Sequence, residues 1–178
     1  NIEELNKDNI SVIFFNYTDG KNNYLDNMDA SMYNNFYLKM KQGVVYKTSQ
    51  INPETYYNFF EKQLKDNLPI IHVSLGSGLS NSINNAKIAV EMLKEKYDNC
   101  DIRIIDTKLA SLGSVLIKNE LIKCRNENLN VSEAEEKVNQ FIDNLNAFYT
   151  TNTLTYFARG GRLSKIEAFL GNALKVNP

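Results

Sequence analysis

The sequence predicts an α/β protein whose strands alternate with helices and form a parallel sheet. Three observations lead to this class. Short apolar runs rich in β-formers recur along the chain, at residues 10–17, 68–75 and 102–105. Segments with apolar residues at helical spacing lie between them, and polar capping residues follow the strand exits. Strands that alternate with helices favour a parallel sheet covered by helices.

The first third of the chain predicts one strand and two helices. Residues 10–17 (ISVIFFNY) read as a buried strand, which turns at residues 18–20. Aromatic and apolar residues at helical spacing predict a helix over residues 30–41. Pro53 suits the first turn of the next helix. The inner side of that helix should carry four large residues, namely Tyr56, Tyr57, Phe60 and Leu64.

The middle of the chain predicts two further strands with a helix between them. Residues 68–75 (LPIIHVSL) form the first, and Ser80 or Ser82 can cap the helix that follows. Residues 102–105 form the second strand, which ends at Asp106. A 3.6-residue period marks the inward face of the helix, with Ile83, Ala86, Val90, Leu93 and Tyr97.

The next segment predicts two helices. A helix over residues 111–125 should turn four apolar residues inward, namely Leu112, Val115, Leu116 and Ile122. Ser132 followed by Glu135 reads as a capping box that opens a second helix. Its apolar stripe would contain Val138, Phe141, Ile142 and Leu145.

The last segment predicts a strand, a turn and a helix. The strand covers residues 147–151, and a Gly-Gly-Arg turn at residues 160–162 follows it. Ser164 with Glu167 reads as another capping box. The helix beyond it would carry Ile166, Phe169, Leu170 and Leu174 on its inner side.

Composition excludes several classes of protein. The chain has 178 residues, 43% of them hydrophobic, so it can bury a core of one domain or somewhat more. The net charge is −1 and no basic run stands out, so no nucleic-acid partner is expected. Cys100 and Cys124, with one histidine, cannot make an ordinary zinc site, and they read as reduced thiols of a cytoplasmic protein. No apolar run reaches the roughly 20 residues of a membrane span, so stable membrane insertion is not expected.

Two glycine-containing loops favour a ligand with an acidic head. Gly160 and Gly161 precede Arg162, whose guanidinium attracts anions, and the helix start expected after them offers spare amides. The loop Gly76-Ser77-Gly78 follows a strand and precedes a helix. Both loops are expected at strand exits or helix starts, which is where α/β sheets bind ligands.

The loop at Gly76 also permits an alternative function, that of a nucleotide-binding enzyme. Gly76-Ser77-Gly78 nearly matches a dinucleotide fingerprint, and Asp106 ends the next strand, where an acidic residue would bind a ribose. The third glycine is missing, however, and Asp106 lies further on than about 20 residues. Ser77 does not fit a nucleophile elbow, because Leu75 and Leu79 replace its glycines. No catalytic residue and no metal site are therefore predicted.

Four short motifs in a fixed order give the sequence a family resemblance. They are TSQ at residues 48–50, SGLS at 77–80, IDTKLASLG at 105–113 and LTYFARGGRLSKIEAFLG at 154–171. In this order the chain resembles the DegV family of bacterial fatty-acid-binding proteins, from about residue 10 to residue 178. Each motif alone is short, but the occurrence of all four in this order is specific to the family.

The resemblance implies a two-domain α/β protein that closes around one long-chain fatty acid. It implies that the acyl tail lies in an apolar tunnel and that Thr48 and Ser77 hold the carboxylate. Arg162 matches the GGR arginine and is expected near the head group or a docking surface. Relatives of this kind are acyl-carrier subunits of a fatty-acid kinase, which makes an acyl phosphate from ATP. The binding protein is then not itself an enzyme, and it needs no cofactor besides its lipid ligand.

The resemblance also carries expectations about domains. Residues 1–147 would be a Rossmann-like domain, and residues 148–178 would lead into an incomplete second α/β domain. The family's opening strand should precede residue 1 and its closing portion should follow residue 178, so we expect a fragment truncated at both ends. Gly76 stands where the family often has a serine, and Asn81 and Ser82 stand where Gly-Thr is usual. A member that has lost its lipid site and only scaffolds a partner is a further alternative.

Overall fold

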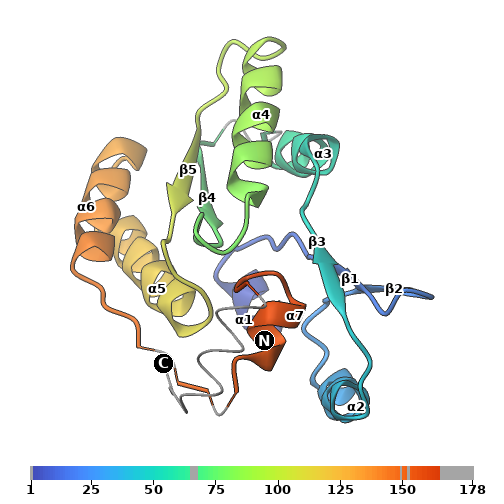
Figure 1. Ribbon diagram of the computed structural model, residues 1–178. Helices are drawn as coiled ribbons and strands as arrows, with labels where there is room; N and C mark the ends of the chain where they lie inside the picture. The colour runs from blue at the N-terminus through green and yellow to red at the C-terminus, as the bar shows by residue number, and fades with distance from the viewer. Residues whose placement is uncertain (1, 65–67, 149, 152, 165–178) are drawn as a thin grey trace. The chain divides into compact units, whose positions relative to one another are not determined.

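The computed structural model describes residues 2–64, 68–148, 150–151 and 153–164 (Figure 1). Contacts divide the chain into two compact units, each described by itself below. Unit 2 is the continuous segment Gln50–Ala147, and unit 1 combines Asn1–Ser49 with Phe148–Pro178. A compact unit defined by contacts need not be a domain of a longer protein. The domain boundary expected after residue 147 therefore stays a prediction.

Unit 2 is built on a parallel pair of strands, as the sequence predicts. β4 (Ile70–Ser74) pairs with β5 (Ile102–Asp106), in a register that sets Ser74 opposite Asp106. The two carboxyl ends therefore leave the sheet side by side. The loop that follows Ser74 therefore lies next to the loop that follows Asp106.

Two helices cover one face of this pair, α3 (Pro53–Gln63) and α4 (Ser82–Lys94) (Figure 1). Pro53 occupies the first turn of α3, as expected, and the Asn52 side chain caps that helix by accepting from the Thr55 amide. A polar contact joins α3 to the segment that follows α4. Glu61 on α3 accepts hydrogen bonds from the side chains of Lys96, Tyr97 and Tyr57. These hydrogen bonds lower the pKa of Glu61 to about 2.

The opposite face packs against α5 (Leu112–Asn126) and α6 (Val131–Asp143) (Figure 1). Ile71 and Val73 of β4 contact this core, because alternate residues of a strand share a face. The core holds six buried residues, namely Ile105, Ile117, Cys124, Ala134, Val138 and Ile142. The stripe predicted for α6 is confirmed, since Phe141 and Leu145 also pack against this core.

The inward face predicted for α5 was wrong for three of its four residues, and the fourth, Ile122, is half-buried. Leu112 is 79% exposed, and Val115 and Leu116 are exposed as well. Ile117 and Cys124 are the fully buried residues of this helix instead. Apolar residues lie on two faces of α5, and the neighbouring sheet and α6 determine which face is buried.

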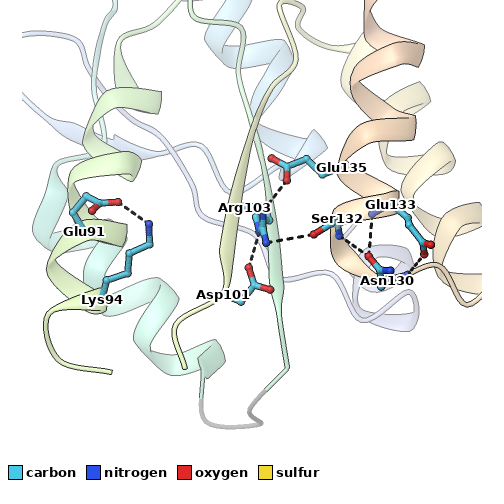
Figure 2. A network of polar contacts seen from close by, with 8 residues as sticks. All are labelled: Glu91, Lys94, Asp101, Arg103, Asn130, Ser132, Glu133 and Glu135. Carbon is cyan, nitrogen blue, oxygen red and sulfur yellow. Dashed lines mark hydrogen bonds and ion pairs between the residues drawn. The ribbon is translucent and has the colours of Figure 1, made fainter. Parts of the chain in front are cut away.

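The capping box of α6 lies two residues earlier than predicted. The Asn130 side chain accepts from the amides of Ser132 and Glu133, and the Glu133 carboxylate accepts from the Asn130 amide. Ser132 and Glu135, the predicted pair, contact Arg103 of β5 instead (Figure 2). The Nη1 atom of Arg103 lies 3.1 Å from Oε2 of Glu135, which ties the strand to the start of the helix.

Unit 1 contains a small antiparallel sheet in the order β2-β1-β3. β1 (Asn16–Thr18) pairs with both β2 (Asn23–Leu25) and β3 (Lys47–Ser49). The long strand predicted over residues 10–17 is thus wrong for most of its length. Only its end joins a sheet, and that sheet is antiparallel. Thr48 of β3 lies opposite Tyr17.

The helix predicted over residues 30–41 is confirmed as α2 (Ala30–Lys41), which Asp29 caps. Phe36 joins α2 to the sheet through ring contacts. Its ring stacks on Tyr46 at 4.4 Å between centroids and meets the edge of Tyr17 at 5.5 Å, and Tyr17 in turn stacks on Tyr24 at 5.0 Å. These half-buried aromatic rings therefore pack α2 against the small sheet. A short helix, α1 (Ile2–Lys7), precedes it.

The end of the described chain differs from the prediction. The described residues between 147 and 151 form no strand, and a short helix, α7 (Thr155–Arg159), precedes the two glycines. The glycines therefore end a helix. The helix predicted beyond Ser164 lies outside the described residues.

Candidate functional site

The Gly-Gly-Arg turn is a helix C-cap that sets the direction of Arg162. Gly161 has a φ of +77°, in the left-handed region that favours glycine. Its amide donates to the Ala158 carbonyl at 3.1 Å, and the Arg162 amide donates to the Phe157 carbonyl at 2.9 Å. These two bonds define a Schellman motif. The first residue beyond the turn, Arg162, is therefore held by backbone contacts to α7.

Arg162 reaches Thr48 within unit 1. Its Nη2 atom donates to Oγ1 of Thr48 at 3.3 Å, a contact between residues 114 positions apart in the sequence. Its Nη1 atom donates to the Gly160 carbonyl, which restrains the guanidinium further. Because Oγ1 of Thr48 accepts this bond, its own proton remains available for an acceptor such as a carboxylate.

A pocket of about 290 Å³ lies at this contact. Its walls are Lys47, Thr48 and the segment from Ala158 to Arg162. Three of these residues are cationic, namely Lys47, Arg159 and Arg162. No residue that lines this pocket is acidic. The pocket therefore favours an anion. Sequence reasoning named Arg162 and Thr48 but missed Lys47 and Arg159. Lys47 directly precedes the TSQ motif, and Arg159 directly precedes the two glycines.

Ser77 lies in unit 2, in the loop that leaves β4. The carbonyl of Gly76 accepts from the amides of Leu79 and Ser80, so the loop is a tight turn. Ser77 is exposed. Ser80 accepts from the Ser82 amide through its hydroxyl, and α4 begins at Ser82. The expected placement of Ser77 at a strand exit and ahead of a helix thus matches the structure.

The loop after β5 holds the Ser77 loop in place. Oδ1 of Asp106 accepts from the amides of Ser77 and Lys108, each at 3.0 Å. Partial burial raises the pKa of Asp106, but the hydrogen bonds from Ser77 and Lys108 outweigh it and leave that pKa below its usual value. In the nucleotide-binding alternative, Asp106 would bind a ribose. Here one of its oxygens is already engaged by the protein's own backbone.

Gly76 allows the two loops to approach each other closely. Its amide donates to the Leu109 carbonyl at 2.9 Å. A Cβ at position 76 would lie 2.6 Å from the carbonyl carbon of Lys108 and 2.7 Å from the Leu109 nitrogen, both backbone atoms. Glycine is therefore the residue that fits this contact.

The structure thus brings Thr48 and Arg162 together in unit 1 and places Ser77 beside Asp106 in unit 2. Over the described ranges, no group of three or more His, Cys, Asp or Glu residues could hold a metal ion. The described helices include none with the length and apolar character that crossing a membrane requires.

Comparison with known proteins agrees with this α/β architecture and with the motifs. A family model described as "Uncharacterised protein, DegV family" matches residues 1–178. A DegV domain-containing protein of Clostridium perfringens is 32% identical over 156 residues, which are 87% of this chain and 54% of that protein. The chain belongs to the DegV family, and it spans about half the length of this relative.

Solved structures show the same fold. A stearic-acid-binding protein from Eubacterium ventriosum has a TM-score of 0.79 and 24% identity, covering 93% of this chain and 57% of its own. The fatty acid kinase B3 protein of Streptococcus pneumoniae, loaded with linoleic acid, has a TM-score of 0.70 and 18% identity, covering 92% of this chain and 56% of its own. At these identities the likeness concerns the fold.

Proposed function

We propose that this chain is part of a protein that binds a long-chain fatty acid and presents it to a partner kinase. The observation that supports this best is the contact between Thr48 and Arg162 at a pocket with cationic walls. A hydroxyl donor beside a guanidinium suits a carboxylate. Membership of the DegV family and the fatty acids in the two neighbouring structures support the same ligand.

Each proposed site residue has a distinct role. Thr48 and Ser77 donate their hydroxyl protons to the fatty-acid carboxylate, and Arg162 keeps Thr48 oriented and adds positive charge. The acyl tail lies in an apolar tunnel, where each buried CH₂ contributes about 0.8 kcal/mol. The protein works as a carrier without a cofactor of its own. The fatty acid kinase B3 protein among the structural neighbours supports a kinase partner, which would phosphorylate the presented carboxylate.

Native mass spectrometry of the purified protein, followed by organic extraction, tests the ligand. We expect a bound species with the mass of a C14–C18 fatty acid. Thr48→Ala and Ser77→Ala should each weaken retention of added oleate by about tenfold, the loss of one hydrogen bond to a charged group. Ser49→Ala is the matched control, because Ser49 is the next residue of β3 and points to the other face.

Arg162→Ala tests the kinase step. In the presence of a bacterial fatty-acid kinase and ATP, this variant should either retain less oleate or form less acyl phosphate at equal oleate loading. A protein that neither carries nor takes up a fatty acid would refute the proposal. Unchanged retention in both hydroxyl variants would refute only the assignment of the head-group residues.

A further inference from the structure

The two loops that leave β4 and β5 are joined by a dense set of short contacts. Asp106 ends β5, opposite Ser74 at the end of β4. One oxygen of its carboxylate accepts from two amides, that of Ser77 across the strand pair and that of Lys108 in its own loop. Asp106 therefore links the loop that carries Ser77 to the loop that follows β5.

The loop after β5 is itself firmly held. Thr107 is fully buried, and its Oγ1 donates to the Leu109 carbonyl at 2.9 Å and accepts from the Leu109 amide at 3.2 Å. Lys108 has a φ of +54°, and its ammonium pairs with Asp143 of α6 at 2.7 Å. Asp106 therefore precedes a turn that the Thr107 hydroxyl bonds to the Leu109 backbone and that Lys108 joins to α6.

We infer that Asp106 is a positioning residue for the Ser77 hydroxyl. By accepting from the Ser77 amide, it fixes the backbone of the one residue that the proposed function assigns to the head group in unit 2. This inference rests on the proposed function and adds a consequence to it. The carboxylate of Asp106 also interacts with the Ser77 side chain, which helps to lower the pKa of Asp106. Asp106 therefore restrains both the amide of Ser77 and the hydroxyl that Ser77 offers to a fatty-acid carboxylate.

Substitutions of Asp106 separate its two properties, acceptor geometry and charge. Asp106→Asn keeps an oxygen that can accept both amides and removes the charge. Asp106→Ala removes the acceptor, and Asp106→Glu keeps the charge but displaces the oxygens by one methylene. In the full chain, oleate affinity measured by titration calorimetry should fall by about tenfold in the Ala and Glu variants. In the Asn variant it should stay within about threefold of the native value, because the positioning contact is restored.

A double-mutant cycle with Ser77→Ala tests whether Asp106 acts through Ser77. If it does, the double variant with Asp106→Ala should bind oleate no more weakly than Ser77→Ala alone. Asn130→Ala is the matched control, because Asn130 also accepts from two amides in unit 2, at the start of α6. Its oleate affinity should equal that of the native chain. Hydrogen exchange should show faster exchange of the Ser77 amide in Asp106→Ala and native exchange in Asp106→Asn.

The outcomes distinguish this inference from the proposed function. Native binding of oleate with equal affinity in all three Asp106 variants would overturn the positioning role alone. So would an Asn variant as weak as the Ala variant, or additive effects in the cycle. If Asp106→Ala does not fold, the contrast between Asn and Glu decides. A native chain that folds but takes up no oleate would overturn the proposed function, and with it the head-group role of Asp106.

Discussion

At the scale of single residues, the burial of His72 makes the stability of the folded protein depend on pH. His72 contacts the rings of Tyr56 and Phe60, with centroids 5.4 and 5.2 Å away, on the α3 side of β4. Its Nε2 atom is buried, with no hydrogen-bond partner among the residues that the structure describes. Desolvation by burial lowers the pKa of His72 from 6.5 to about 4. The folded protein therefore keeps this ring neutral under conditions that protonate it in the unfolded chain.

The direction of the pH effect follows from this difference. Between pH 6.5 and 4 the unfolded state binds a proton that the folded state does not, so stability falls as the pH falls. We expect the free energy of unfolding to drop by about 2 kcal/mol between about pH 7 and about pH 5 on account of His72. His72→Phe should remove this part of the dependence. Urea unfolding of the native chain and of His72→Phe at both pH values measures this drop. An equal drop in the two proteins would contradict the prediction.

A second prediction at this scale concerns Gly76. A Cβ there would press on the backbone of Lys108 and Leu109, whereas a Cβ at Gly78 has no atom within 4 Å in the described structure. Gly76→Ala should therefore lower the free energy of unfolding by roughly 1–3 kcal/mol. Gly78→Ala, the matched control, should change it by less than about 0.5 kcal/mol. Urea denaturation of both variants measures the difference, and equal values would show that the loops separate at little cost.

At the scale of elements, the C-cap of α7 carries the third prediction. Gly161 has a positive φ and Gly160 does not, so alanine is strained at position 161 by about 1–2 kcal/mol. Gly161→Ala should unravel the cap and release Arg162 from Thr48. Gly160→Ala is the control, with ordinary helical backbone and a Cβ 3.3 Å from the nearest atom. Hydrogen exchange at the Arg162 amide should accelerate only in the first variant. Native protection in both would refute the role of the cap.

Helices with a strong local signal were predictable, such as α2 with its aromatic period and α3 with Pro53 at its start. The cap of α6 was misplaced because Asn130 and Ser132 are both good capping residues, and only the structure shows that Ser132 contacts Arg103. Residues 10–15 have strand composition, but a strand also needs a partner, which local sequence does not specify.

The candidate site was predictable to the extent that its motifs are local. Thr48 and Ser77 were assigned through the family resemblance that the short motifs carry, and Arg162 also through the glycine turn that precedes it. The bond from Arg162 to Thr48 joins residues 114 positions apart, so no local pattern contains it. Asp106 was noticed for a different reason, as a ribose ligand, because its bond to the Ser77 amide depends on the register of β4 and β5.

At the scale of the whole molecule, the division into two units makes a fourth prediction. Residues 50–147 contain a complete parallel pair with helices on both faces and a buried core. Expressed alone, this segment should show cooperative thermal unfolding, followed by circular dichroism. The longer segment 1–147, expressed in the same way, tests the domain boundary proposed from the family resemblance. If only the longer segment unfolds cooperatively, residues 1–49 are required for the fold of unit 2.

Unit 1 contains residues from both ends of the sequence, so it cannot be completed until the ribosome has synthesised the whole of unit 2. Thr48 is synthesised early, whereas Arg162 follows only after all of unit 2 has been made. Domains generally fold as units during synthesis, the N-terminal ones first. The contact between Thr48 and Arg162 can therefore form only after the residues of unit 2 have been synthesised. In a nascent chain that is stalled before residue 162, the Ser77 loop would already be formed. The pocket at Thr48 would still lack the wall that Arg162 provides.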